Sequence, residues 1–118
     1  MPTNIDGKTN GPSISWPDGK RIAVMVTFDF DAEYLRISRA KSKGKTIGFT
    51  DFSRGQYGPH EGLVRCLSML DTLGIKSTFF VPGIVAEQYT DCVRSIHEHG
   101  HELAYHGYMH ESERGLSL

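Results

Sequence analysis

Two pairs of side chains in this sequence have the types and spacing to hold a metal ion. Asp29 and Asp31 close an apolar run, and His106 and His110 follow another apolar segment near the C-terminus. One carboxylate and two neutral imidazoles make a three-ligand set with open coordination positions, which is what a catalytic metal needs. The second carboxylate is then free to accept a proton. These residues predict a metal-dependent hydrolase.

Each pair also has a structural interpretation. Asp residues at the end of a strand often bind the amides of the following loop, and this alternative stays open for Asp29 and Asp31 taken alone. His106 and His110 can reach one ion if the segment between them makes a helical turn; otherwise they are half-buried loop histidines. The presence of both pairs at equivalent strand ends favours the metal site.

A second group of histidines, His97, His99 and His101, surrounds a helix end that Gly100 is expected to terminate. A protonated imidazole at a helix C-terminus is favoured by the helix dipole, by roughly 0.3–1 kcal/mol. We therefore expect these three side chains to be structural and to contribute little to metal binding.

Three apolar segments predict the strands that must position the metal ligands. Residues 22–28 are an almost unbroken apolar run with β-branched side chains, typical of a strand covered on both faces. Residues 77–81 predict a second buried strand, ended by Pro82 and Gly83, and residues 102–105 predict a third. In parallel α/β folds, ligands gather at the carboxyl ends of the strands. We therefore expect both pairs at one edge of the sheet.

Two helices are expected between these strands. Pro59 can begin the first, and Gly74 can end it as a left-handed cap. Its apolar residues recur at helical spacing: Leu63, Val64, Leu67, Leu70 and Leu73. Thr90 can cap the second helix, which Gly100 ends. The order strand–helix–strand–helix–strand predicts an α/β fold with parallel strands and crossover helices.

Residues 29–58 are polar and weakly patterned, which predicts a long excursion from the fold. Their basic run, residues 36–45, lacks apolar periodicity, so we expect a solvated loop and no nucleic-acid binding. Tyr57 could close over a substrate beside Gly58, and the first amides of the helix after Pro59 could hold an anionic oxygen. A plain turn with a helix start explains the same sequence.

The chain has 118 residues, 38% apolar and 23% charged, with a net charge of −1. We divide it into a polar N-terminal extension, residues 1–20, and one domain, residues 21–118. No run is apolar enough for a membrane span or a secretion signal, so we expect a cytoplasmic protein without membrane contact. Cys66 and Cys92 are expected on helices as free thiols.

Two motifs resemble those of the polysaccharide deacetylase superfamily, the NodB-homology or carbohydrate esterase 4 proteins. Residues 27–31 read TFDFD and are similar to its first motif, and residues 106–110 read HGYMH and are similar to its second. Residues 76–83 and 99–106 resemble the family between these motifs. RGQYG at residues 54–58 is similar to the intracellular branch of peptidoglycan-deacetylase-like proteins, cyclic imidases and allantoinase-type enzymes.

The resemblance implies that Asp29 is the general base and that Asp31, His106 and His110 bind a divalent metal, commonly zinc. It also implies a distorted (β/α) barrel with fewer than eight strands, of which this chain would be the N-terminal portion, a partial NodB-homology domain. A full barrel takes roughly 250 residues. The later family motifs, with an arginine that orients the base and a histidine that acts as general acid, have no counterpart here.

The implied activity is hydrolysis of a non-peptide C–N bond in a small-molecule amide, imide or N-acetyl sugar. Without a secretion signal, a cytoplasmic cyclic imide or ureide is the alternative substrate. A further alternative is a non-catalytic remnant or half-barrel that needs a partner chain, because an open sheet edge and an uncovered apolar interior favour association. A homo-oligomer would satisfy the same need.

Overall fold

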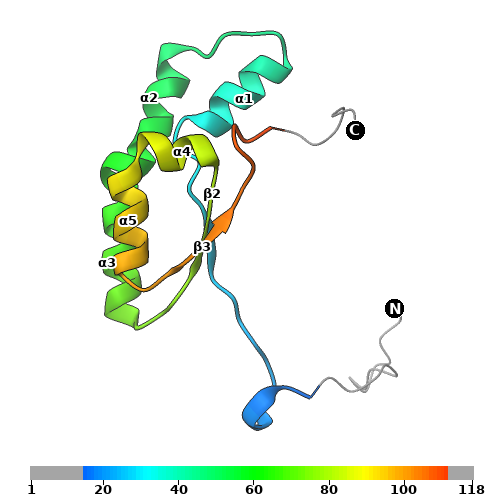
Figure 1. Ribbon diagram of the computed structural model, residues 1–118, viewed down its shortest axis with the longest axis vertical. Coiled ribbons are helices and arrows are strands. Elements are labelled where there is room, and N and C mark those ends of the chain that lie inside the picture. Colours follow the sequence, from blue (N-terminus) through cyan, green and yellow to red (C-terminus); the bar gives the residue numbers. More distant parts are fainter. Residues whose placement is uncertain (1–14, 112–118) are drawn as a thin grey trace.

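The computed structural model describes residues 15–111. Its centre is a parallel sheet with the strand order β1-β2-β3 (Figure 1). The strands are β1 (Thr27–Asp29), β2 (Thr78–Val81) and β3 (Glu102–Tyr105). The expected α/β fold with parallel strands is confirmed, and the second and third strands lie where the sequence predicted them.

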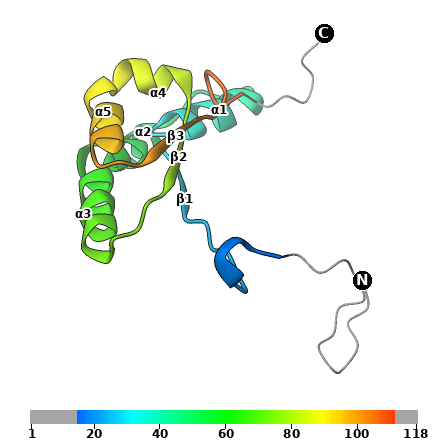
Figure 2. The ribbon, with the colours of Figure 1, turned by 60° about the horizontal axis from the view of Figure 1, so that its bottom comes forward.

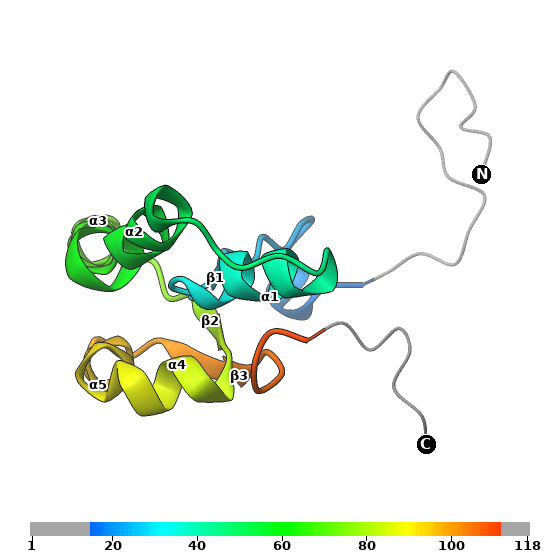
Figure 3. The same cartoon turned by 90° about the horizontal axis from the view of Figure 1, so that it is seen from above.

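The helices lie mainly along one face of the sheet, where Figures 1 and 3 show α3 and α5 beside the strands. They are α1 (Tyr34–Ser42), α2 (Phe49–Tyr57), α3 (Leu63–Leu73), α4 (Gly83–Gln88) and α5 (Thr90–Glu98), with the short turns η1 (Pro17–Gly19) and η2 (Gly58–Gly62). Within the described residues, none of these α-helices covers the opposite face in these views. No described helix is long and apolar enough to cross a membrane.

The core lies between α3, α5 and the covered face of the sheet. Its buried apolar residues are Phe30, Leu63, Leu67, Leu70, Phe79, Val81, Val85 and Ile96. Phe28 stacks on Phe79 with ring centroids 5.1 Å apart, which joins β1 to β2 on this face. The predicted helix end at Gly74 is confirmed by its left-handed φ of 63°. The thiols of Cys66 and Cys92 are free, as expected.

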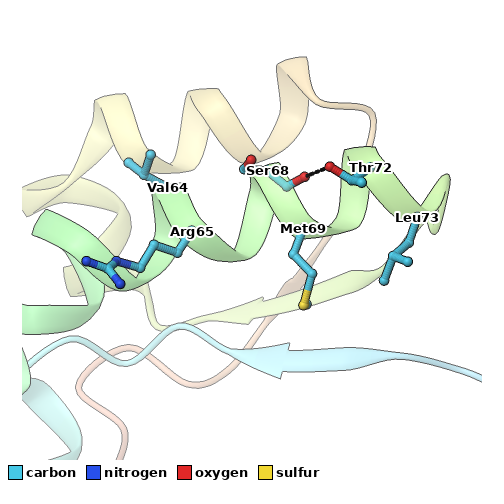
Figure 4. Close-up of a pocket in the computed structure, with 6 residues that line it drawn as sticks. All are labelled: Val64, Arg65, Ser68, Met69, Thr72 and Leu73. Carbon is cyan, nitrogen blue, oxygen red and sulfur yellow. Dashed lines mark hydrogen bonds between the residues drawn. The ribbon is translucent and has the colours of Figure 1, made fainter.

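The outer face of α3 is exposed. Val64 and Leu73, which share the helical spacing of the core residues, are 66% and 60% exposed. They line a hollow of about 510 Å³ together with Met69 and Ser68 (Figure 4), where Ser68 accepts a hydrogen bond from Thr72. This hollow holds none of the predicted site residues.

The prediction of a covered strand over residues 22–28 is wrong in its length and burial. Only Thr27–Asp29 is a strand, because β2 is its only neighbour among the described residues and pairs with just these positions. Before them, Ile22, Val24 and Met25 are 75%, 78% and 87% exposed. Figures 1 and 2 show this segment running away from the body of the fold.

The long excursion over residues 29–58 is also wrong, because α1 and α2 occupy most of it. The basic run lies largely on α1, which ends at Ser42. No residue of α1 is fully buried, so the helix lacks the continuous apolar stripe by which a sequence pattern reveals a helix. Of the predicted N-terminal extension, residues 1–14 lie outside the described residues.

Two predicted helix starts are corrected. The chain does not turn at Pro59, since α2, η2 and α3 follow without a break and the residues at both junctions have helical φ and ψ. Thr90 is the first residue of α5, and its hydroxyl donates to the carbonyl oxygen of Ala86 instead of capping the helix. α4 was not predicted, because Pro82 and Gly83 indicated only the end of a strand.

Candidate metal centre

The sheet delivers Asp31 and His106 to the same edge. The amide of Phe30 donates to the carbonyl oxygen of Phe80 at 2.9 Å, and the amide of His106 donates to that of Val81 at 3.2 Å. The hydrogen-bond ladder therefore continues one residue past β1 and β3. Asp31 and His106 follow the carboxyl ends of two parallel strands that flank β2, as predicted.

The segment from His106 to His110 is a loop and not the helical turn that the i, i+4 spacing required. Gly107 and His110 have left-handed φ values of 72° and 55°. The first amides of α4 hold this loop, since Gly83 donates to the carbonyl oxygen of Gly107 at 2.9 Å and Ile84 to that of Tyr108 at 3.0 Å. The two imidazoles meet through this folded-back loop.

Three side chains converge at this edge. Asp31 Oδ1 lies 3.7 Å from His106 Nε2, and Asp31 Oδ2 lies 3.7 Å from His110 Nε2. The two imidazole rings are 4.7 Å apart and almost perpendicular. One ligand atom from each residue lies within 4.8 Å of the other two. The side chains of Asp31, His106 and His110 are 11%, 32% and 25% exposed, so the cluster is shielded but reachable.

The cluster fits a metal ion better than it fits a hydrogen-bonded group. Asp31 Oδ1 and His106 Nε2 are buried and have no hydrogen-bond partner among the described residues. Their separation of 3.7 Å exceeds hydrogen-bond length. Zinc bonds to carboxylate oxygen and imidazole nitrogen at about 2.0–2.2 Å, so an ion between these atoms would satisfy both. One carboxylate and two imidazoles are also ligands that zinc accepts.

Burial raises the pKa of Asp31 above its usual value, and the neighbouring charge of Asp29 adds to the effect. His110, His106 and, more weakly, Arg39 oppose this shift. A nearby positive charge, such as a metal ion, would stabilise the ionised form of a carboxyl group in such surroundings.

The other three predicted site residues, Asp29, Tyr57 and Gly58, are not part of the three-residue cluster. Asp29 is exposed at the end of β1. Tyr57 is 55% exposed at the end of α2, where its ring packs close to Gly62. Gly58 continues the helix, and its carbonyl oxygen accepts from the amide of Leu63. A free helix start with unpaired amides is therefore absent from this described segment.

Sequence reasoning missed the residues that hold the two ligand segments in place. A methyl group at Gly83 would overlap the ring of Tyr108 in the histidine loop. Ser38 of α1 donates a hydrogen bond to the carbonyl oxygen of His110 at 2.8 Å. Neither residue type is a metal ligand, and only their three-dimensional contacts reveal the role. The Pro82–Gly83 signal could have suggested a close approach of two backbones.

The three-residue cluster lies at the carboxyl ends of parallel strands in an α/β fold, the position where such folds usually bind their ligands. The family model described as Polysaccharide deacetylase matches residues 39–117, and the chain belongs to this family. The Peptidoglycan deacetylase-like protein FGM2 of Gibberella zeae is 33% identical over 94 residues, which are 78% of this chain and 27% of that protein. The Peptidoglycan deacetylase of Helicobacter pylori is 34% identical over 62 residues, 52% of this chain and 21% of that protein.

Comparison with solved structures supports the same family and fold. A protein of Mycobacterium smegmatis assigned as a polysaccharide deacetylase superposes with a TM-score of 0.78 and 41% identity, over 92% of this chain and 37% of that one. PuuE allantoinase superposes with a TM-score of 0.71 over 92% of this chain and 41% of its own, at 22% identity, which shows a shared fold. The resemblance drawn from the two motifs is confirmed. The chain spans about a quarter of the length of the curated relatives that it matches. Its fold corresponds to part of a NodB-like (β/α) barrel.

Proposed function

We propose that Asp31, His106 and His110 hold one divalent metal ion, with zinc the expected ion, in a hydrolase of non-peptide C–N bonds. The observation that carries this proposal is the convergence of these three side chains, in which Asp31 Oδ1 and His106 Nε2 are buried without hydrogen-bond partners in the part of the chain that the structure describes. Membership of the deacetylase family supports it. When bound, a divalent ion supplies Lewis acidity, which polarises a carbonyl oxygen and makes water a stronger acid.

Asp29 is proposed as the general base. Its carboxylate is exposed to solvent and lies near enough to Asp31 to raise the pKa of that residue. An accessible carboxylate beside the site can take the proton of a water molecule that attacks an amide carbon. The exposed ring of Tyr57 is proposed to contact the substrate, with the backbone of Gly58 beside it. Free helix amides are not part of this proposal, because Gly58 continues the helix.

An N-acetyl sugar is the first candidate substrate, because two relatives carry names of peptidoglycan deacetylases. A cyclic imide or an allantoin-like ureide is the second, and rests on the resemblance of RGQYG at residues 54–58 to the intracellular branch. Placement inside the cell belongs to the same proposal. The identity of the leaving nitrogen distinguishes these substrates in an assay.

Metal binding and hydrolysis test the proposal separately. Calorimetry with zinc is expected to show about one ion per chain for the wild type. Hydrolysis assays then compare N-acetyl sugars, cyclic imides and ureides with zinc, cobalt and manganese. We expect little or no turnover by the 118-residue chain alone, because general acid help is worth typically about 10²–10⁴-fold and its donor is not identified among the described residues. Rapid turnover that is lost in Asp29→Asn would show that the chain carries its own acid.

A non-catalytic half-barrel that needs a partner is the second candidate. The exposed side chains of Ile22, Val24 and Met25 favour it, together with the unpaired outer edges of β1 and β3 within the described residues. Unpaired edges and apolar side chains promote association. Size-exclusion chromatography tests this candidate, and a stable monomer would count against it.

A further inference from the structure

A buried carboxylate, that of Glu33, lies two residues after Asp31 and fixes the turn that carries Asp31. Glu33 is only 6% exposed. Both of its carboxylate oxygens accept from the hydroxyl of Tyr89, at 3.1 and 2.9 Å. Tyr89 lies between α4 and α5, 56 residues further along the chain. This contact therefore ties the start of α1 to a distant junction of two helices.

A second helix closes on the same residue. A methyl group at Gly55 of α2 would overlap the Cα atom of Glu33 and lie 2.8 Å from its Cβ atom. Real Cβ atoms essentially never approach so closely, so only a glycine fits here. Glu33 is therefore held at two points: α2 packs against its backbone, and the hydroxyl of Tyr89 binds its carboxylate. Burial, followed by the hydrogen bond to Glu33, raises the pKa of Tyr89 to about 12, so its hydroxyl keeps the proton that it donates.

The backbone between Asp31 and Glu33 needs such support. Ala32 has a φ of 49°, in the left-handed region that residues with a Cβ atom rarely adopt. Conformations of this kind persist where the surroundings hold them. The direction of the Asp31 side chain depends on this turn, because Asp31 is the residue directly before Ala32.

We propose that the hydrogen bond between Glu33 and Tyr89 positions the metal centre. It fixes the turn from Asp31 to Glu33, and hence the distance of the Asp31 carboxylate from the two imidazoles. The effect reaches the histidine loop as well, since α1 begins directly after Glu33 and its Ser38 holds the carbonyl oxygen of His110. Glu33 and Tyr89 are positioning residues, and this inference rests on the proposed metal site.

Tyr89→Phe removes the hydroxyl and keeps the ring. We expect its Co²⁺ affinity to fall by about 10-fold, the lower range for loss of a supporting contact, with a changed visible absorption spectrum of the bound Co²⁺. Tyr105→Phe is the matched control, because Tyr105 is 74% exposed, and it should bind as the wild type does. Titrations followed by visible absorption are run well below the unfolding temperature of each variant.

Glu33→Gln keeps one acceptor oxygen for the Tyr89 hydroxyl, so we expect it to retain more affinity than Glu33→Ala. This pair keeps the test decisive if Tyr89→Phe does not fold. A purely structural contact would lower the unfolding temperature but leave affinity and spectrum unchanged, and that result would overturn the inference. A wild-type chain that binds no Co²⁺ would overturn the proposed metal centre, and the inference with it.

Discussion

Two groups of histidines lie at opposite ends of β3, and their partners differ. At the amino end, His101 is 4% exposed and its Nδ1 atom accepts from the amide of Ser77 at 3.3 Å, while His99 pairs with Asp71 at 2.7 Å. At the carboxyl end, the Nε2 atom of His106 is buried and has no hydrogen-bond partner within residues 15–111. The Nε2 atom of His101 likewise has no hydrogen-bond partner within the described residues, so a missing partner does not by itself separate the two groups. The difference lies in what faces the ring: a carboxylate and a second imidazole face His106, whereas the ring of His101 packs against Phe79 with centroids 5.4 Å apart.

The surroundings of the two groups differ in charge as well as in packing. Burial lowers the pKa of His101 below its usual value, and the charge of Lys76 adds to this effect. The Ser77 amide already occupies its Nδ1 atom, so a proton there would break a hydrogen bond. At the other end, the two imidazoles face one carboxylate at 3.7 Å. Within the described residues, this is the only group of three such side chains that could hold a metal ion, so a cation is favoured at the carboxyl end and not at the amino end.

The largest expected effect is a loss of bound metal when the histidines at the carboxyl end of β3 are replaced, but not when those at the amino end are. His106→Ala combined with His110→Ala removes two of three proposed ligands, and we expect the bound zinc to fall to background, a loss of affinity of at least about 100-fold. The matched variant replaces His97, His99 and His101 with alanine and should keep wild-type metal content if it folds. Elemental analysis after dialysis measures both. Equal metal in the first variant and the wild type would mean that the ligands are misassigned.

The next largest effect is a difference in metal affinity between variants of the two aspartates at the carboxyl end of β1. Asp31→Asn replaces the proposed ligand and should lose most of the metal. Asp29→Asn should keep most of it, because Asp29 is exposed and outside the cluster. Zinc calorimetry at pH 7.5 compares the two variants, since metal binding requires deprotonated ligands and weakens at low pH. Similar losses in both variants would contradict the separate roles of base and ligand.

A smaller effect concerns stability at the amino end. The pKa of folded His101 lies below 6.5, the value expected when unfolded. The unfolded chain therefore binds more protons between these two values, and the free energy of unfolding falls as the pH drops below about 6.5, by at most about 1.4 kcal/mol per pH unit. Urea unfolding between pH 5 and 7.5 measures this slope. His101→Asn should be less stable at pH 7.5 but have a flatter profile, and an unchanged slope would exclude His101 as its source.

The parallel α/β arrangement and the positions of two strands could be predicted because their signals are local. Residues 77–81 and 102–105 are short, largely apolar runs. The sequence also predicted that Asp31, His106 and His110 meet at one edge of the sheet, which the structure shows, and their binding of a metal stays a prediction. The partners of each strand are not local. Residues 22–28 have the composition of a covered strand, yet most of them have no neighbour within the described residues.

The supports of the site were missed for the same reason. Glu33 and Tyr89 meet across 56 positions of sequence, and nothing in the residues around Glu33 indicates a buried carboxylate. α1 was missed because it buries no residue completely. The histidine spacing predicted a meeting of two rings, which the structure shows, but by a loop that needs Gly107 and the amides of α4.

The smallest expected effect is that of the surface pair at the amino end. Asp71 and His99 are 45% and 37% exposed, and exposed ion pairs contribute roughly 0.2–1 kcal/mol. Asp71→Asn keeps an oxygen that can accept from the imidazole, so we expect the free energy of unfolding to fall by less than about 1 kcal/mol. Urea unfolding at low and high salt measures the change, and high salt should reduce it because ions screen exposed charges. Co²⁺ affinity should stay at the wild-type value, since this pair lies at the end of β3 remote from Asp31. A measurable loss of affinity would mean that the two ends are coupled through β3, and that the histidines at the amino end do more than stabilise the fold.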